Sequence, residues 1–229
     1  MVVPRTAAEM KSLHGASYAA KFDRLPNAER LSRILERVEL DHEEDILDLG
    51  CGGGHLLQLL APRVRSCVGV DFSEAFVKAA QERIKSNGIA NASVECSSIE
   101  DYCDSHPSRF DSAFALDLSE HVYDEDWMRI LRSVRASLVP VGRLYIHTPN
   151  AGFFVERMKE RNFILRQPEQ HVAVRSVADN VALIREAGFT RVDVEILPHY
   201  NVLKWLHPLS RLPLVGGLFE ARMLITATR

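Results

Sequence analysis

The chain has 229 residues, a formal net charge of −3 at pH 7 and an isoelectric point near 6.3, which suits one α/β domain with a substantial core and gives no long-range attraction to nucleic acid or anionic lipid. The four cysteines form no C-x-x-C pair and no zinc spacing, so we expect reduced thiols in a cytoplasmic protein. We read no secretory leader and no run of about 18 apolar residues that would span a membrane.

Residues 1–45 precede the first predicted strand and contain one amphipathic helix. Four apolar residues recur there at helical spacing, namely Leu31, Ile34, Leu35 and Val38. They predict a helix over residues 27–40, with Pro26 near its start. Tyr18 and Phe22 lie upstream of this helix, and packing of both rings onto the domain surface is one interpretation of them.

The stretch from Asp45 to Gly54 reads D-I-L-D-L-G-C-G-G-G and combines a strand with a glycine turn. The apolar run from Ile46 to Leu49 suits a buried strand, and a helical pattern of leucines begins directly after the glycines. A strand, a glycine turn and a helix in this order are typical of a doubly wound α/β nucleotide site. His55 replaces the third glycine of a dinucleotide fingerprint, and no Gly-Lys-Ser/Thr ending of a phosphate loop is present.

A second strand over residues 67–71 ends in an acidic residue. Asp71 follows Asp48 at about the 20-residue interval expected of a ribose-binding carboxylate. At the carboxyl edge of a strand such a group can accept from both ribose hydroxyls, and Phe72 could pack on an adenine face. The alternative role of Asp71 is a helix N-cap, which Ser73 could also provide.

The rest of the chain alternates between predicted strands and helices. The expected helices cover residues 74–86, 125–138 and 176–187, the second of them closed by Pro140 and Gly142, and the strands cover 92–96, 110–116, 143–147, 192–196 and 223–227. Residues 151–175 form a less regular, polar insert. We therefore predict an α/β fold with a doubly wound, seven-stranded, mostly parallel sheet.

Polar side chains follow the fourth and fifth predicted strands, where a parallel sheet binds its ligands. Asp117, Glu120 and His121 have the spacing i, i+3, i+4, which would bring them to one face of a helical turn. Thr148 and Asn150 follow the next strand. His121 is the natural general base of this group, since an imidazole has an ordinary pKa near neutrality.

Residues 199–219 form an apolar stretch interrupted by Pro208 and Pro213. One interpretation is a cover on the sheet edge and core. The other is an apolar pocket or an interfacial anchor for a hydrophobic acceptor, for which Lys204 and Arg211 would suit a lipid surface.

The acid of the first strand, the G-x-G-x-G turn and the acid of the second strand together resemble motif I and its following acid in class I S-adenosylmethionine (SAM) methyltransferases. The resemblance implies a Rossmann-like SAM-binding domain over residues 46–229, with residues 1–45 as a helical lid and residues 151–175 and 199–219 as substrate-side inserts. The cofactor contacts that it implies are Asp48, Gly50, Cys51, Gly52, Gly54, Asp71, Phe72, Ser98, Ile99 and Asp117. Ser97 stands where the family often has Asp, so the adenine contact would come from the backbone around Ser98 and Ile99.

The D-x-x-E-H motif with its downstream histidine resembles the E-x-x-E-H…H arrangement of ubiquinone-biosynthesis O-methyltransferases and small-RNA 2′-O-methyltransferases. That arrangement would make Asp117, Glu120, His121 and His171 ligands of a divalent metal, Mg²⁺ or Mn²⁺. We favour the metal-free interpretation, in which Glu120 and His121 are the catalytic pair. Tyr18, Asn150 and His171 are then expected to contact the substrate.

Together these features predict a SAM-dependent enzyme that methylates a small molecule, most simply at a hydroxyl. The alternatives are N-methylation of a small amine, methylation of a glycan or lipid-linked acceptor, RNA 2′-O-methylation, and a SAM-binding subunit without activity. The acidic isoelectric point and the absence of a basic stripe count against RNA. We expect a cytoplasmic protein, with peripheral membrane contact through residues 199–219 as a further hypothesis.

Overall fold

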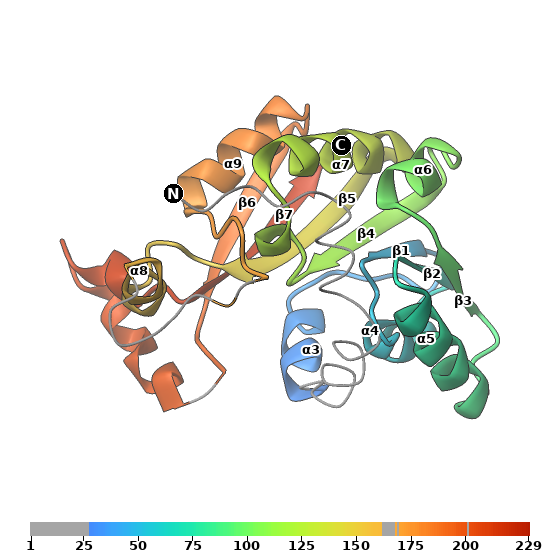
Figure 1. Cartoon of the computed structure of the whole chain (residues 1–229), viewed down its shortest axis with the longest axis horizontal. Coiled ribbons are helices and arrows are strands. Elements are labelled where there is room, and N and C mark those ends of the chain that lie inside the picture. Colours follow the sequence, from blue (N-terminus) through green and yellow to red (C-terminus); the bar gives the residue numbers. More distant parts are fainter. Residues whose placement is uncertain (1–27, 162–167, 169, 201) are drawn as a thin grey trace.

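The computed structural model describes residues 28–161, 168, 170–200 and 202–229, so Tyr18 and Phe22 lie outside the described residues. These residues form a seven-stranded sheet in the order β3-β2-β1-β4-β5-β7-β6 (Figure 1). The strands are β1 (Asp45–Leu49), β2 (Ser66–Asp71), β3 (Ala92–Cys96), β4 (Phe110–Leu116), β5 (Leu138–Pro149), β6 (Arg191–Leu197) and β7 (Arg222–Thr228). β7 runs antiparallel to both β5 and β6, and the other pairs are parallel. The predicted sheet is therefore confirmed.

Helices cover both faces of this sheet. The α-helices are α3 (Ala28–Leu35), α4 (His55–Leu60), α5 (Glu74–Ser86), α6 (Ile99–Asp104), α7 (Asp124–Ser137), α8 (Phe154–Glu160) and α9 (Val177–Glu186). The 3-10 segments are η1 (Ala61–Arg63), η2 (Ser119–His121), η3 (Val202–Arg211) and η4 (Gly216–Phe219).

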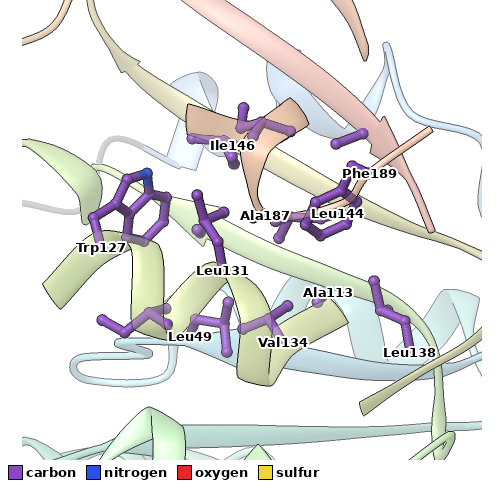
Figure 2. Packing of buried hydrophobic residues seen from close by; sticks show 14 of the residues in the cluster. Leu49, Ala113, Trp127, Leu131, Val134, Leu138, Leu144, Ile146, Ala187 and Phe189 are labelled. Atoms are coloured by element: carbon purple, nitrogen blue, oxygen red, sulfur yellow. The ribbon is translucent and has the colours of Figure 1, made fainter. Parts of the chain in front are cut away.

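Successive residues of β1 point to opposite faces and so divide the core in two. Ile46 packs with α3, α4 and α5, while Leu47 and Leu49 pack with α6, α7 and α9. Figure 2 shows the second cluster, in which Trp127 of α7 is fully buried beside Leu131. A strand buried on both faces must be apolar throughout, as the continuous run in β1 is.

Two predicted boundaries are wrong. The first helix ends at Leu35 rather than residue 40, although Leu31, Ile34 and Leu35 are buried as expected. Pro140 and Gly142 do not close a helix; they lie within β5, which begins at Leu138. Leu138 pairs with Phe110 and the register then shifts at a bulge, where a strand tolerates proline.

The two inserts also depart from expectation. Residues 151–175 are more regular than predicted because they contain α8. Residues 202–211 form η3, in which no side chain is buried. The interpretation of this stretch as a core cover holds for Leu203, which packs on a small buried cluster, but not for Trp205, which is 77% exposed, or for Leu214, beyond η3, which is fully exposed.

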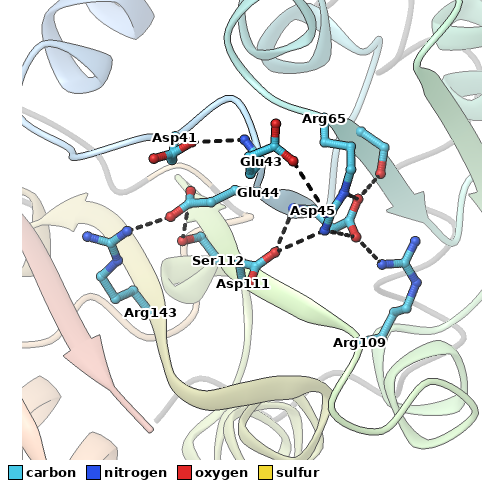
Figure 3. A network of polar contacts seen from close by, with 10 residues as sticks. Asp41, Glu43, Glu44, Asp45, Arg65, Arg109, Asp111, Ser112 and Arg143 are labelled. Carbon is cyan, nitrogen blue, oxygen red and sulfur yellow. Dashed lines mark hydrogen bonds and ion pairs between the residues drawn. The ribbon is translucent and has the colours of Figure 1, made fainter.

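An ion-pair network closes the amino-terminal end of the sheet (Figure 3). The Asp45 carboxylate accepts hydrogen bonds from Arg65 Nε at 3.1 Å and Arg65 Nη2 at 2.7 Å, and it also pairs with Arg109. Burial alone would raise the pKa of Asp45, but the bonds from Arg65, Ser66 and Arg109 hold it well below its ordinary value. These polar residues stabilise the end of β1 opposite to the glycine turn.

Candidate active site

The three glycines of the motif adopt positive φ for different packing reasons. Gly50, Gly52 and Gly54 have φ of 65°, 51° and 75°, a conformation that costs other residues free energy. A Cβ on Gly54 would lie 2.9 Å from Ala80 Cβ of α5, and one on Gly50 would lie 3.1 Å from Leu118 Cδ1. Within the described part of the chain, a Cβ on Gly52 would have only the Phe76 ring nearby, at 3.9 Å. Gly54 is therefore required by helix packing, whereas the described residues leave the space above Gly52 open.

The two acids lie beside this turn. Asp71 is buried and accepts from the backbone N–H of Gly52 at 3.0 Å and of Ser73 at 2.9 Å, so its carboxylate holds the glycine turn against the segment that leads into α5. Asp48 is buried with its Oδ2 atom unpartnered among the described residues. Burial, reinforced by the charge of Asp71, raises the pKa of Asp48. An unpartnered buried oxygen next to an open glycine turn fits a polar ligand bearing a cationic amine.

Four further expected contacts divide into side-chain and backbone candidates. The Cys51 thiol packs over Gly69, where an added Cβ would meet Sγ at 2.7 Å, so Cys51 can offer only its backbone. Phe72 is 38% exposed directly after β2. The Ser98 hydroxyl caps α6 by accepting from Asp101 N at 3.1 Å. Ile99 packs partly buried against the core, which leaves its backbone as the available contact.

Asp117 does not share a face with Glu120 and His121. It adopts a positive φ of 53°, and its carboxylate pairs with Arg30, with Arg222 at 3.2 Å and with His147 Nδ1 at 2.9 Å. Burial alone would raise the pKa of Asp117, but His147, Arg30 and Arg222 hold it well below its ordinary value. The expected role of Asp117 as a metal ligand or cofactor contact has to compete with this ion cluster.

No pattern in the sequence indicated the partners of Asp117. Arg30 comes from α3, His147 from β5 and Arg222 from the start of β7. The Tyr200 hydroxyl contacts His147 Nε2 at 2.7 Å, and both guanidinium groups lie over its ring, 5.3 Å (Arg30) and 4.9 Å (Arg222) from the centroid. This cluster fastens α3 to the carboxyl end of the sheet.

Glu120, His121 and His171 do come together. Their ligand-type atoms all lie within 4.8 Å of one another. The two imidazole rings pack edge to face, with their centroids 5.0 Å apart. His121 Nδ1 lies 2.9 Å from the Gln170 carbonyl, which can only accept, so Nδ1 carries the proton and Nε2 is the acceptor nitrogen. His171 Nδ1 is buried with no partner among the described residues.

Burial controls the charge of this trio. It raises the pKa of Glu120 to about 8, with a further contribution from Asp117, while Thr148 Oγ1 donates to Glu120 Oε2 at 3.1 Å. Burial, with the neighbouring His121, lowers the pKa of His171 to about 4. At neutral pH His171 is therefore a neutral imidazole, the form that can accept a proton or bind a metal.

Arg175 explains how the insert reaches this position. Its Nη1 and Nη2 donate to the carbonyls of Ser119 and Val122 at 2.7 and 2.6 Å, and its side chain is 5% exposed. The backbone N–H groups of Val172 and Ala173 also donate to the Glu120 carbonyl. The sequence suggested no role for Arg175.

Asn150, expected to contact substrate, is buried, and its Oδ1 accepts from Gly152 N at 3.0 Å in a turn.

The comparisons agree with this fold. Residues 19–194 match the family model described as a methyltransferase domain, and the chain belongs to that family. A crystal structure of a SAM-dependent methyltransferase from Archaeoglobus fulgidus has the same fold, with a TM-score of 0.64, 18% identity and coverage of 88% of this chain and 92% of that one. The family match therefore defines the class as that of the methyltransferases, as the motif predicted, with SAM as the cofactor, and the Archaeoglobus structure supports the fold.

Curated relatives give a narrower similarity. The chain is 32% identical over 147 residues to a ubiquinone biosynthesis O-methyltransferase of Coxiella burnetii. This match covers 64% of this chain and 56% of the relative. It is 32% identical over 184 residues to the protein of the same name from Neisseria meningitidis serogroup C, covering 77% of this chain and 76% of the relative. The chain thus spans little more than half of the Coxiella relative's length.

Proposed function

We propose that this chain transfers the methyl group of SAM to a hydroxyl of a small-molecule acceptor. The observation that carries the proposal is the meeting of His171 with Glu120 and His121, which lie on a loop that contacts the glycine turn through Leu118. Leu118, two residues before Glu120, packs against Gly50, so the acid–histidine loop lies beside the cofactor cradle. The name of the O-methyltransferase relatives supports a hydroxyl acceptor.

The cofactor residues follow from the open turn. Asp48, the backbone at Gly52 and Asp71 would hold SAM, which supplies an electrophilic methyl group on a sulfonium. The protein has to align the acceptor oxygen with that methyl and remove its proton. His121 Nε2 can accept the proton because Nδ1 donates to the Gln170 carbonyl. Glu120, held by Thr148, can orient the acceptor hydroxyl.

A metal-assisted version of the same reaction is the second candidate. Two imidazoles and one carboxylate within 4.8 Å of one another, with the unpartnered His171 Nδ1, are a donor set that fits a divalent cation. Glu120, His121 and His171 would hold the ion, which would lower the pKa of a bound hydroxyl. Asp117 would contribute its charge through the ion cluster rather than as a ligand.

The test measures S-adenosylhomocysteine release with a panel of small phenols, alcohols and amines. If His121 is a general base, His121→Ala should lower the rate by about two to four decades, a chelator should have no effect, and His171→Ala should have a small one. If a metal is used, both variants should lose activity and a chelator should abolish it reversibly. His42→Ala, at an exposed position, is the control.

Two results would contradict the proposal. One is methylation of the amines alone, which would move the function to N-methylation. The other is full activity in both histidine variants. Catalysis would then rest on alignment of the acceptor, and Glu120, His121 and His171 would have no role in it.

A further inference from the structure

The exposed apolar side chains gather on one segment. Among the described residues, the large hydrophobic side chains that are exposed are Phe72, Val141, Val202, Trp205, Leu212, Leu214 and Val215. Five of these seven belong to residues 202–215, on η3 and the turn that follows it. We name these five residues the apolar ridge. A soluble surface rarely concentrates its exposed apolar area in this way unless another apolar body covers it.

The ridge belongs to a peripheral unit formed by α8, η3 and η4, which lies at one end of the molecule in Figure 1. Leu203 packs on the small cluster of Phe153, Val155 and Ala221, and the rings of Phe154 and Phe219 lie 5.9 Å apart. These contacts use the inner side chains of the unit and leave the ridge outside. Its exposure therefore does not arise from an unfolded segment.

The charge of this unit indicates which kind of partner surface could cover the ridge. Residues 199–219 contain no acidic residue, and Lys204 and Arg211 are exposed beside the ridge. The ammonium of Lys204 lies 5.7 Å from the centre of the Trp205 ring. On α8 and the residue after it, Arg157, Glu160 and Arg161 are exposed. This unit is basic although the whole chain is acidic. Because charges beyond about 10 Å are screened at 0.1 M salt, the local basic charge acts on a surface that approaches the ridge.

We propose that the apolar ridge docks on an anionic phospholipid bilayer. A tryptophan beside a lysine, with aliphatic side chains around them, matches the interfacial zone of a bilayer, where an indole ring lies at the headgroup level. Lys204 and Arg211 then meet the lipid phosphates. None of the described helices is long and apolar enough to cross a membrane, so the contact is one of surface docking.

The two tryptophans make the test direct. Trp127 is fully buried in the core and Trp205 is 77% exposed, so a change in emission on adding vesicles reports Trp205. We expect a blue shift with vesicles of phosphatidylglycerol and phosphatidylcholine, and quenching when the lipids carry bromine. Lys204→Gln with Arg211→Gln should weaken the apparent vesicle affinity about thirty-fold, at roughly fivefold for each basic residue.

Co-sedimentation of the variants completes the test. Trp205→Ser with Leu214→Ser should abolish sedimentation with vesicles and leave S-adenosylhomocysteine binding unchanged, while Val141→Ser, at a 78% exposed position of β5, should sediment like the parent protein. An unchanged emission spectrum with every vesicle composition would overturn the proposal. Sedimentation equilibrium that shows a dimer dispersed by Trp205→Ser would also overturn it, in favour of a second copy of this chain.

Discussion

Replacing Gly52 by alanine should separate cofactor binding from folding. The residue has a φ of 51°, and among the described residues an added Cβ would meet no atom closer than the Phe76 ring at 3.9 Å. As far as the described residues go, the folding cost is therefore that of the backbone conformation, about 1 kcal/mol. The new methyl group would instead occupy the open space above the turn, where the cofactor has to approach the backbone.

Two other glycines calibrate this expectation. Gly88 has a φ of 63° and no atom of the described residues within 4 Å of a Cβ, so Gly88→Ala carries the same backbone cost at a position outside the cradle. Gly54→Ala adds a clash at 2.9 Å with Ala80 Cβ, and overpacking raises the expected destabilisation to about 3 kcal/mol. Gly52→Ala should lose about 3 kcal/mol of cofactor affinity, which is roughly hundredfold in Kd, through displaced charge-assisted hydrogen bonds.

The assay combines calorimetry of S-adenosylhomocysteine with denaturant unfolding of the three variants. Gly52→Ala and Gly88→Ala should unfold at similar denaturant concentrations, and only Gly52→Ala should lose the ligand. An unchanged Kd for Gly52→Ala would refute the reasoning, because the space above the turn would then not be the cofactor site. A Gly54→Ala protein as stable as Gly88→Ala would show that α5 can move away from the turn.

Two further predictions concern the acids. Asp71→Asn should keep the fold but weaken SAM binding by about one to two decades, since a charge-assisted hydrogen bond contributes about 1.5–3 kcal/mol; an unchanged calorimetric Kd would exclude Asp71 from the site. Asp45→Asn should lower the free energy of unfolding by about 2 kcal/mol above pH 5. The pKa of Asp45 is lowered in the folded protein, so its contribution is complete above the unfolded pKa near 3.8 and is lost as the pH falls further. The two proteins should therefore converge in acid, and a gap that stays constant down to pH 2 would contradict the ion-pair explanation.

The sequence determined the parts of this protein that depend on local backbone constraints. Apolar runs marked the strands, and β3 and β4 have the predicted bounds. The glycine turn with its two acids could be predicted from the sequence, because a positive φ favours glycine at a position whatever its tertiary contacts are. The helix that begins at Asp124 was also found, but its end was misplaced, since Leu138 belongs to a strand through pairing with Phe110. A proline and a glycine cannot distinguish a helix stop from a bulged strand without that partner.

Only the tertiary structure decided which side chains meet. The spacing of Asp117, Glu120 and His121 suggested one helical face, but Asp117 turns to Arg30 and Arg222, which lie far away in the chain. His171 reaches Glu120 because Arg175 ties the insert to η2. The exposure of Trp205 likewise depends on what α8 leaves uncovered. Burial and ion pairing depend on contacts between segments that are distant in the chain. A local sequence pattern contains no information about those contacts.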